Sequence, residues 1–447
     1  MHKVKMRALL ALILVGCLLL SLGIFGYFYI TDGGDWVAFA SNRHIYKNGA
    51  LQTGTITDRS GEVLASTRDG VRSYHADPTV RASLLHLIGD PGGNIGTGAQ
   101  IKFADKLSGF SLIDGLYNAA TSDAAVQLTV DAAASAAAYK ALGSFNGAVV
   151  VYNYRTGEIL CSVSKPTFDP VSVPSDLTTN PRFAGVYVNR VYQASYAPGS
   201  VMKVITAAAA IEQLPDLFDQ RFTCDGSIEV DGKTINCMHT HGTIAVGTAL
   251  AKSCNVAFAE LALQLGGNTL KDYCDQLGLL SGYDIDGIKT TAGRFDASPD
   301  NTAALAWSGI GQSTNLVSPI NMAIFMGAIG GDGKTAAPRL LADSGRDTIR
   351  LLESDTAQTL TRMLRYNVTS VYGTDRFPEA VREGLCAKSG TAEVDGAEPH
   401  AWFAGFVDSD NYPYAFAAIA EHGGYGSQTA ADIIAAVLRE LTVSQAG

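Results

Sequence analysis

A serine and a lysine three residues apart, Ser200 and Lys203, have the types and the spacing to do chemistry. Residues three apart on a helix lie on the same face, so the lysine amine can reach the serine hydroxyl. A serine hydroxyl is a weak nucleophile until a base takes its proton, and a desolvated lysine amine can act as that base. The pair predicts a serine nucleophile activated by lysine, although a helix-capping serine followed by a surface lysine has the same pattern.

Two further short motifs follow in order along the chain. Ser253-Cys254-Asn255 opens an apolar stretch at 256–265 that is typical of a helix, and Lys388-Ser389-Gly390-Thr391 lies ahead of an apolar segment that begins at His400. Each motif alone occurs by chance in many chains of this length. A Ser-x-x-Lys, a Ser-x-Asn and a Lys-Ser-Gly motif in this order are instead typical of enzymes that form an acyl-enzyme on the serine.

A helix is predicted to position the first motif. Pro198 and Gly199 break the preceding segment. Ser200 then begins an alanine-rich apolar run to Leu214, which is predicted as a helix. A helix that begins at the nucleophile directs free N–H groups and a positive field toward the place where an oxyanion would form. Upstream, Asp131 is predicted to cap a second alanine-rich helix.

Strands are predicted at both ends of this helix-rich middle. The segments at 147–152 and 158–163 are joined by a polar turn, and those at 400–407 and 414–420 by another, so each pair is predicted as a hairpin. A last amphipathic helix is predicted at 429–441. This order of elements predicts an α+β domain, with one antiparallel sheet flanked by helices.

The N-terminal region predicts one transmembrane helix. Residues 8–30 carry no charge, and as a helix they are long enough to cross a hydrocarbon core of roughly 30 Å. Lys3, Lys5 and Arg7 precede this anchor, and their positive charge places the tail at 1–7 in the cytoplasm. We therefore expect a single-pass protein of the cell membrane, with the rest of the chain extracytoplasmic.

The chain beyond the anchor is predicted to form two domains. Residues 31–125 carry short alternating segments, with a strand, a turn and a second strand at 55–65, and we interpret them as a small spacer or dimerisation-type domain. Residues 126–447 carry all three motifs and form the catalytic domain. The net charge of −10, without a basic run after the first few residues, gives no reason to expect nucleic acid as a partner.

Together with the anchor, the three motifs resemble those of class B penicillin-binding proteins, the monofunctional peptidoglycan D,D-transpeptidases. The segment at 55–65 is similar to the family's first extracytoplasmic motif, and the segment at 147–170 to its opening hairpin and loop. His400-Ala401-Trp402-Phe403 is similar to the smaller, actinobacterial-type members. The departures are Ser389, where threonine is commoner, and Cys254 in the second motif. The resemblance implies a serine transpeptidase and β-lactamase-like fold.

The resemblance also implies a role for each motif residue. Ser200 would attack the carbonyl of a penultimate D-alanine and expel the terminal one, while Lys203 would accept the serine proton. Ser253 would relay protons, Asn255 would hold the donor's backbone amide, and Lys388 would supply positive potential. The expected catalytic residues are Ser200, Lys203, Ser253, Asn255 and Lys388. The expected substrate-binding residues are Ser389, Gly390 and Thr391, and the family forms its oxyanion hole from the backbone N–H groups of Ser200 and Thr391.

Other functions share parts of this pattern. A D,D-carboxypeptidase differs only in that water resolves the acyl-enzyme, whereas a β-lactamase deacylates quickly, usually through a water activated by glutamate. No Glu-x-x-x-Asn pattern lies between 255 and 388. A non-catalytic penicillin-binding scaffold in a wall-synthesis complex is a further alternative, against which the complete set of motifs argues.

The resemblance implies peptidoglycan stem peptides as substrates and β-lactam antibiotics as covalent inhibitors, and it implies no required cofactor. The 447 residues leave no room for a separate glycosyltransferase module beside the predicted domains. We therefore expect a SEDS-type membrane glycosyltransferase as the partner that polymerises the glycan strands.

Three cysteines and a histidine lie in and before the second motif. Cys224, Cys237, His241 and Cys254 have the residue types of zinc ligands, although their spacing is not that of a standard zinc finger. A Cys224–Cys237 disulfide is an alternative outside the cytoplasm, and unpaired buried thiols are a third. The sequence leaves the structural zinc site, the disulfide and the free thiols open.

Overall fold

The computed structural model describes residues 2–37, 46–47, 50–51, 54–68, 71–110, 124–295 and 301–444. The chain divides into two compact units, of which unit 1 comprises Met1–Ile56, Ala65–Ser73 and Ile88–Val126, and unit 2 comprises Thr57–Leu64, Tyr74–Leu87 and Gln127–Gly447. These segments interleave, whereas the sequence predicts one boundary after residue 125. Parts of the predicted tail and spacer domain, namely residue 1 and residues 38–45, 48–49, 52–53, 69–70 and 111–123, lie outside the described residues.

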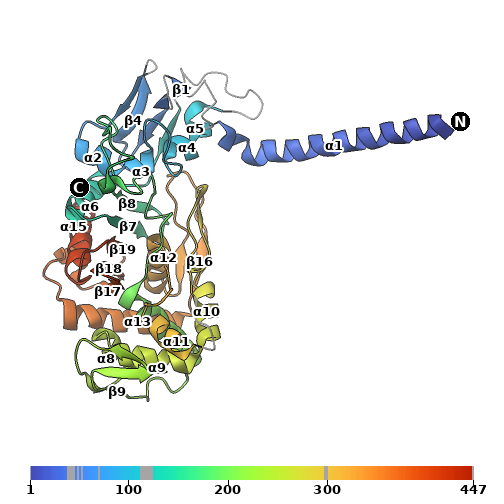
Figure 1. Cartoon of the computed structure of the whole chain (residues 1–447). Helices are drawn as coiled ribbons and strands as arrows, with labels where there is room; N and C mark the ends of the chain where they lie inside the picture. The colour runs from blue at the N-terminus through green and yellow to red at the C-terminus, as the bar shows by residue number, and fades with distance from the viewer. Residues whose placement is uncertain are drawn as a thin grey trace. The chain divides into compact units, whose positions relative to one another are not determined.

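The N-terminal helix α1 runs over His2–Trp36 (Figure 1). Its segment Val4–Gly34 is long and apolar enough to cross a membrane, and among the described residues no other helix meets that test. The helix is longer than the uncharged segment at 8–30, because the basic residues before it and the polar residues after it continue the same helix. One membrane-spanning helix at this place is therefore supported by length and composition.

The remaining elements of the N-terminal part are short. They are β1 (Tyr46–Lys47), β2 (Ala50–Leu51), β3 (Thr55–Thr57), β4 (Val63–Arg68), β5 (Val71–Tyr74), α2 (Pro78–Ser83), α3 (Leu85–Ile88), α4 (Ala99–Lys102), α5 (Ala104–Ser108) and β6 (Ala125–Gln127). The strand, turn and strand predicted at 55–65 are confirmed as β3, a turn and β4, which belong to a sheet of the order β5-β4-β3-β6.

The centre of unit 2 is a five-stranded antiparallel sheet of the order β17-β18-β19-β7-β8. Its strands are β17 (Leu385–Val394), β18 (Ala397–Val407), β19 (Tyr414–Ala420), β7 (Gly147–Asn153) and β8 (Ile159–Lys165). Both predicted hairpins are confirmed, as β7–β8 and β18–β19. The edge strand β17 was not predicted, because a polar motif at 388–391 interrupts its apolar residues.

Helices and short strands make up the rest of unit 2. The helices are α6 (Ala132–Leu142), α7 (Met202–Gln213), α8 (Val246–Ala251), α9 (Asn255–Leu265), α10 (Gly267–Gln276), α11 (Thr302–Gly309), α12 (Pro319–Gly330), α13 (Ser354–Asn367), α14 (Glu379–Arg382) and α15 (Thr429–Ser444), with single turns η1 (Pro181–Phe183), η2 (Gly199–Val201) and η3 (Val368–Tyr372). The short strands are β9 (Phe222–Cys224), β10 (Ser227–Val230), β11 (Lys233–Asn236), β12 (Gly242–Ile244), β13 (Asp284–Ile285), β14 (Ile288–Lys289), β15 (Lys334–Ala336) and β16 (Thr348–Arg350).

Helices cover both faces of the central sheet. Val149 and Val151 of β7 share a buried core with α6 and α15. Successive residues of a strand point to opposite faces, so Tyr152 points the other way, and its hydroxyl donates to the carbonyl of Ile324 in α12 at 3.4 Å. Because neither face meets water, all seven residues of β7 are buried, and its sequence is a continuous apolar run rather than an alternating one. This confirms the predicted α+β sheet flanked by helices.

The predicted cap of α6 is confirmed to the residue. The Asp131 carboxylate accepts the backbone N–H of Ala134 at 2.9 Å, and the helix ends at Leu142. A carboxylate at this place satisfies one of the N–H groups that the first turn of a helix leaves free.

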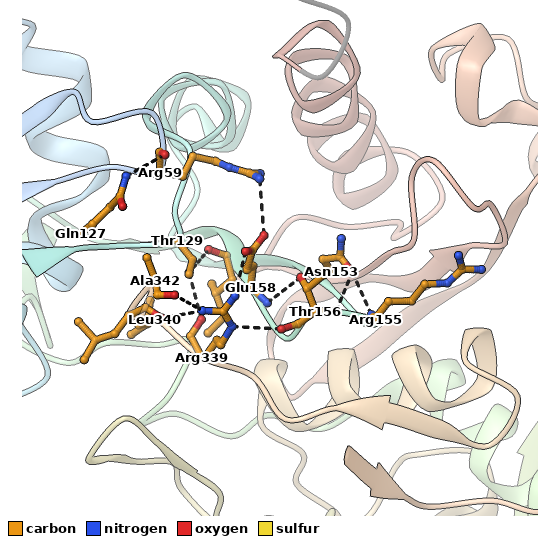
Figure 2. A network of polar contacts seen from close by, with 12 residues as sticks. Arg59, Gln127, Thr129, Asn153, Arg155, Thr156, Glu158, Arg339, Leu340 and Ala342 are labelled. Atoms are coloured by element: carbon orange, nitrogen blue, oxygen red, sulfur yellow. Dashed lines mark hydrogen bonds and ion pairs between the residues drawn. The ribbon is translucent and has the colours of Figure 1, made fainter. Parts of the chain in front are cut away.

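A buried arginine fixes the turn of the β7–β8 hairpin to a distant loop (Figure 2). Arg339 is only 3% exposed, and its guanidinium donates to the Glu158 carboxylate at 2.9 Å. It also donates to three backbone carbonyls, those of Thr156, Leu341 and Ala342. The planar guanidinium carries five N–H donors in a fixed fork, which suits it to hold several acceptors at once.

Candidate active site

The predicted nucleophile lies at the entrance to α7. Ser200 is the middle residue of the 3-10 turn η2, which leads directly into the helix. The residue before it, Gly199, has φ +54, and a Cβ there would lie 2.7 Å from the carbonyl oxygen of Thr391. Glycine is therefore required at this position on two counts, conformation and space. The turn brings Ser200 against the third motif.

Lys203 lies one helical turn after Ser200, with its amine next to the serine hydroxyl. The distance from Lys203 Nζ to Ser200 Oγ is 3.1 Å, as expected for residues three apart on one helical face. The same Nζ lies 3.1 Å from Ser253 Oγ and 2.6 Å from Asn255 Oδ1. The lysine is completely buried. One amine thus contacts both hydroxyls expected to exchange protons, and it also contacts the amide oxygen of Asn255.

The second motif turns sharply so that two of its side chains face Lys203. Ser253 has φ +55, a left-handed conformation that residues other than glycine rarely adopt. Cys254 then caps α9, with its Sγ 3.5 Å from the backbone N of Ala257, and Asn255 is the first residue of the helix. Backbone strain of this kind is found most often at functional sites, where the surrounding structure holds it in place.

The third motif lies on β17, beside the nucleophile turn. Lys388 Nζ lies 3.2 Å from Ser253 Oγ, so this hydroxyl stands between the two lysines. Gly390 is needed for the close approach, because a Cβ there would lie 2.8 Å from the carbonyl oxygen of Pro198. On the neighbouring strand, Trp402 Nε1 donates to the carbonyl of Ala197 at 3.0 Å. The strand β17 is thus fixed directly against the loop that carries Ser200.

Burial determines the charge state of both lysines. Burial lowers the pKa of Lys388 to about 7, because the ammonium form loses its hydration. The pKa of Lys203 is also held well below its usual range, chiefly by burial and then by the charge of Lys388, while Cys237 and Cys254 act in the opposite direction. A neutral Lys203 amine can accept the proton of Ser200, which is the condition for the predicted base.

Tyr372 belongs to the site, although sequence reasoning missed it. Its hydroxyl lies 2.9 Å from Ser389 Oγ and 3.5 Å from Lys388 Nζ, and it accepts the backbone N–H of Ser389 at 3.0 Å. Tyr372 ends a π-helical turn, and such turns are frequent at functional sites. No sequence signal marks this tyrosine, because it lies in an irregular segment 16 residues before the third motif.

The structure brings the five predicted catalytic residues into one cluster around Lys203 and Ser253. Thr391 lies two residues beyond Ser389 on β17, so both side chains point to the same face of the strand. The hydroxyl of Ser389 contacts Tyr372, and Thr391 pairs in register with Ala401 of β18. The arrangement can carry out nucleophilic attack by a serine with a lysine base and nearby positive charge.

The cysteine and histidine side chains also lie together, and Cys254 belongs to the second motif. The ligand atoms of Cys224, Cys237, His241 and Cys254 all lie within 4.8 Å of one another. The Cys224–Cys237 disulfide is not formed, since every cysteine among the described residues is unbonded. The geometry therefore favours a clustered ligand set or unpaired buried thiols, two of the three interpretations that the sequence leaves open.

Comparison with known families gives a match over most of the chain. Residues 147–439 match the family model described as the penicillin binding protein transpeptidase domain. This segment covers all three motifs and the central sheet.

Comparison with known proteins gives related sequences from mycobacteria. The chain is 28% identical over 315 residues to the peptidoglycan D,D-transpeptidase PbpA of Mycobacterium tuberculosis, an alignment that covers 63% of this chain and 63% of that protein. It is 30% identical over 290 residues to the penicillin-binding protein PbpB of Mycolicibacterium smegmatis, covering 57% of this chain and 41% of that protein. The alignments thus span less than two thirds of these relatives.

Solved structures share the fold. The imipenem acyl-enzyme complex of penicillin-binding protein A from M. tuberculosis superposes with a TM-score of 0.77 at 24% identity, covering 88% of this chain and 99% of that one. The D,D-transpeptidase domain of a peptidoglycan glycosyltransferase from Eggerthella lenta gives a TM-score of 0.75 at 24% identity, again over 88% of this chain. At this level of identity the likeness establishes the fold.

Proposed function

Because the chain belongs to the penicillin-binding protein transpeptidase family, we propose that it is a class B peptidoglycan D,D-transpeptidase that acts through an acyl-enzyme on Ser200. The observation that carries the proposal is the position of the Lys203 amine, completely buried and 3.1 Å from both Ser200 Oγ and Ser253 Oγ. A buried neutral amine between two hydroxyls is the arrangement that lysine-activated serine chemistry needs.

In the first half of the reaction, Ser200 Oγ attacks the carbonyl of the penultimate D-alanine of a stem peptide. Its proton passes to Lys203 Nζ, and the developing oxyanion lies toward the backbone N–H groups of Ser200 and Thr391. Ser253, placed between Lys203 and Lys388, delivers the proton to the departing amine of the terminal D-alanine. The products are an ester on Ser200 and free D-alanine.

In the second half, an amine from a neighbouring stem peptide attacks the ester. Lys203 and Ser253 remove the proton from this amine, and Ser200 regains its proton as the new amide bond forms. The positive potential of Lys388 suits the terminal carboxylate of the donor, beside the hydroxyls of Ser389 and Thr391. Asn255 is positioned to hold the donor peptide through its side-chain amide.

β-Lactam antibiotics would acylate the same serine, since their strained amide imitates the donor peptide. The relative from M. tuberculosis that shares this fold has been solved as an imipenem acyl-enzyme, which supports this part of the proposal. The proposed acyl transfer takes its nucleophile, base and positive charge from the chain itself, so it requires no cofactor. A zinc ion at the cysteine and histidine cluster would have a structural role.

The location follows from the substrate. Peptidoglycan is crosslinked outside the cytoplasmic membrane, so α1 would anchor the chain with unit 2 on the extracytoplasmic side. The positive charges before the apolar segment favour this orientation. Residues 31–125 would form a spacer domain between the anchor and the catalytic domain of 126–447.

A SEDS-type membrane glycosyltransferase is the proposed partner, since the match covers only a transpeptidase domain and crosslinking needs newly polymerised strands. Affinity purification of the full chain from gently solubilised membranes tests this proposal. A polytopic glycosyltransferase should co-purify with the wild type and be lost when α1 is replaced by an unrelated transmembrane helix. A chain that purifies without such a partner and crosslinks glycan strands at full rate would contradict it.

Labelling with a fluorescent penicillin tests the enzymatic proposal. The wild-type chain should acquire a stable covalent label, and Ser200→Ala should acquire none, while Ser60→Ala, at an exposed turn of the chain, should label normally. Rapid release of hydrolysed drug would indicate a β-lactamase instead. With a peptide substrate, release of D-alanine without any transfer to an amine acceptor would indicate a D,D-carboxypeptidase.

A further inference from the structure

Two distances within the cysteine and histidine cluster match those of a tetrahedral zinc site. Zinc binds thiolates at about 2.3 Å and imidazole at about 2.0 Å, so the ligand atoms of a tetrahedral site are separated by about 3.5–3.8 Å. The distance from Cys237 Sγ to Cys254 Sγ is 3.8 Å, and that from Cys224 Sγ to His241 Nδ1 is 3.5 Å. Both distances match the edges of such a tetrahedron, and a disulfide would require about 2.05 Å.

Three of the four ligands lie at the ends of short strands, and the fourth lies at the start of α9. Cys224 ends β9, Cys237 follows β11, His241 precedes β12, and Cys254 caps α9. The four short strands between residues 222 and 244 form two separate two-stranded sheets, and Figure 1 shows β9 beside α9. Two-stranded sheets are marginal by themselves, and small structures of this kind are commonly stabilised by a metal or by disulfides.

The cluster is connected directly to the second motif. Cys254 is the middle residue of that motif, between Ser253 and Asn255. The backbone N–H of Asn255 donates to Cys237 Sγ at 3.0 Å, and its side-chain amide donates to the carbonyl of Asn236 at 2.6 Å. The other end of the same side chain lies 2.6 Å from Lys203 Nζ. Asn255 therefore joins the thiol cluster to Lys203, the proposed general base.

We propose that Cys224, Cys237, His241 and Cys254 bind one zinc ion, and that this ion holds Ser253 and Asn255 in the geometry that acylation of Ser200 requires. Three thiolates and one imidazole are a soft ligand set that favours zinc over magnesium or calcium. The metal takes no part in acyl transfer. Through Cys254 it fixes the strained turn at Ser253. The four ligands are therefore positioning residues, and this part of the inference rests on the proposed acyl-enzyme function.

Metal binding is tested on the full chain purified in detergent. Metal analysis should find about one zinc ion per chain in the wild type, and intact mass should be the same with and without reductant. In Cys224→Ser and in His241→Ala the zinc content should fall well below one per chain, while the control Cys274→Ala, a buried cysteine on α10, should retain it. A wild type without zinc, or one that is two daltons lighter without reductant, would overturn the site.

The positioning role is tested with a fluorescent penicillin on the same proteins. Cys224 and His241 are the informative positions, because both lie outside the second motif and the contacts of Cys224 include the carbonyl of His239 and His241 Nδ1. Loss of such outer contacts to a site typically costs about 10–100-fold. The second-order rate constant for acylation should therefore fall at least about tenfold in Cys224→Ser and in chelator-treated wild type. Adding Zn²⁺ to the chelator-treated wild type should restore its rate constant, whereas adding Mg²⁺ should not.

Circular dichroism of the zinc-free wild type distinguishes displacement of Ser253 and Asn255 from unfolding of the protein. We expect its helix content to be unchanged while acylation slows, and the Cys274→Ala control to acylate at the wild-type rate. Zinc-free, folded protein that acylates as fast as the zinc-bound form would overturn the positioning role. If zinc-bound wild type is not acylated at all, the proposed function fails and the positioning role fails with it, while metal analysis still decides the zinc site.

Discussion

At the scale of single residues, the two buried lysines determine how the proposed reaction responds to pH. Lys203 must be neutral to accept the serine proton, so acylation should slow as pH falls through its lowered pKa. Lys388 should be charged to attract the substrate carboxylate, and its pKa of about 7 means that this charge is lost above neutrality. The second-order rate constant for acylation should therefore pass through a maximum when it is measured across pH.

The variant Lys388→Arg isolates the alkaline limb of this profile. Arginine keeps its charge at every accessible pH, so the decline above about pH 7 should disappear even if the maximum rate is lower. The acid limb, which belongs to Lys203, should remain. An unchanged alkaline decline in Lys388→Arg would show that another group controls it.

Tyr372 provides a second prediction at this scale. Its hydroxyl accepts the backbone N–H of Ser389 and contacts the Ser389 hydroxyl, so Tyr372→Phe should loosen the part of β17 that is proposed to bind the substrate carboxylate. A lost hydrogen bond is worth about 0.5–1.5 kcal/mol, which corresponds to a change of about two- to tenfold. We expect this change in KM for a peptide donor more than in kcat. Tyr366→Phe, half exposed on α13, is the matched control and should leave both constants unchanged.

The motif residues could be found from sequence because their chemistry depends on local spacing, as with Ser200 and Lys203 on adjacent turns. Tyr372 could not, because its position depends on a π-helical turn and on the pairing of β17 with β18. The same limit applies to the cysteines. Their residue types indicated zinc ligands, but only the fold of β9 to α9 shows that Cys237 and Cys254 lie 3.8 Å apart.

At the scale of elements, the bounds of a helix or hairpin could be predicted to within a few residues where the sequence contains both its cap or turn and its apolar segment. Asp131 as the cap and the alanine-rich segment to Leu142 specify α6 without help from the rest of the fold. The strand β17 lacks such a signal, because the polar residues Lys388 and Ser389 interrupt its apolar residues, although Lys388 is buried. Its existence is determined by the neighbouring strand β18 and by the nucleophile turn.

The buried arginine of Figure 2 allows a stability prediction for the β7–β8 hairpin. Arg339→Lys keeps the charge but cannot reach the Glu158 carboxylate and the three backbone carbonyls together. Acceptors left unsatisfied cost about 1–3 kcal/mol each, so the free energy of unfolding should fall by about 2–3 kcal/mol. Urea unfolding followed by circular dichroism measures this change.

The matched control lies on the same turn. Arg155 pairs with Asp410 at 2.7 Å, but these side chains are 48% and 89% exposed. Exposed ion pairs contribute about 0–1 kcal/mol, so Arg155→Lys should change the unfolding free energy by less than about 1 kcal/mol. If Arg339→Lys and Arg155→Lys lower the free energy of unfolding equally, the burial of Arg339 does not add to the stability of the hairpin.

At the scale of the whole molecule, the two compact units are made of segments that lie far apart in the sequence. Residues 57–64 belong to unit 2 because Asp58 turns back toward α6, where its carboxylate lies 3.4 Å from the backbone N of Ala132. This contact joins residues 74 positions apart, and no local pattern encodes it. The long apolar helix α1, in contrast, could be predicted from composition alone.

The proposed orientation in the membrane gives a prediction at this scale. Alkaline phosphatase fused to the C-terminus should be active, because it folds only outside the cytoplasm, and β-galactosidase fused at the same place should be inactive. Inserting three lysines directly after Ile30 should reduce the phosphatase signal by weakening the charge difference across α1. Strong β-galactosidase activity from the unaltered chain would place unit 2 in the cytoplasm and contradict the proposed location.

Mass spectrometry of the chain during turnover tests the central claim most directly. The purified full chain is mixed with a peptide ending in D-alanyl-D-alanine and with a D-amino acid as acceptor, quenched with acid, and digested for peptide mapping. We predict an acyl group on the peptide that contains Ser200, release of D-alanine, and a product in which the acceptor amine has replaced it, all absent from Ser200→Ala. An acyl group on another residue, or product formed by Ser200→Ala at the wild-type rate, would contradict the account.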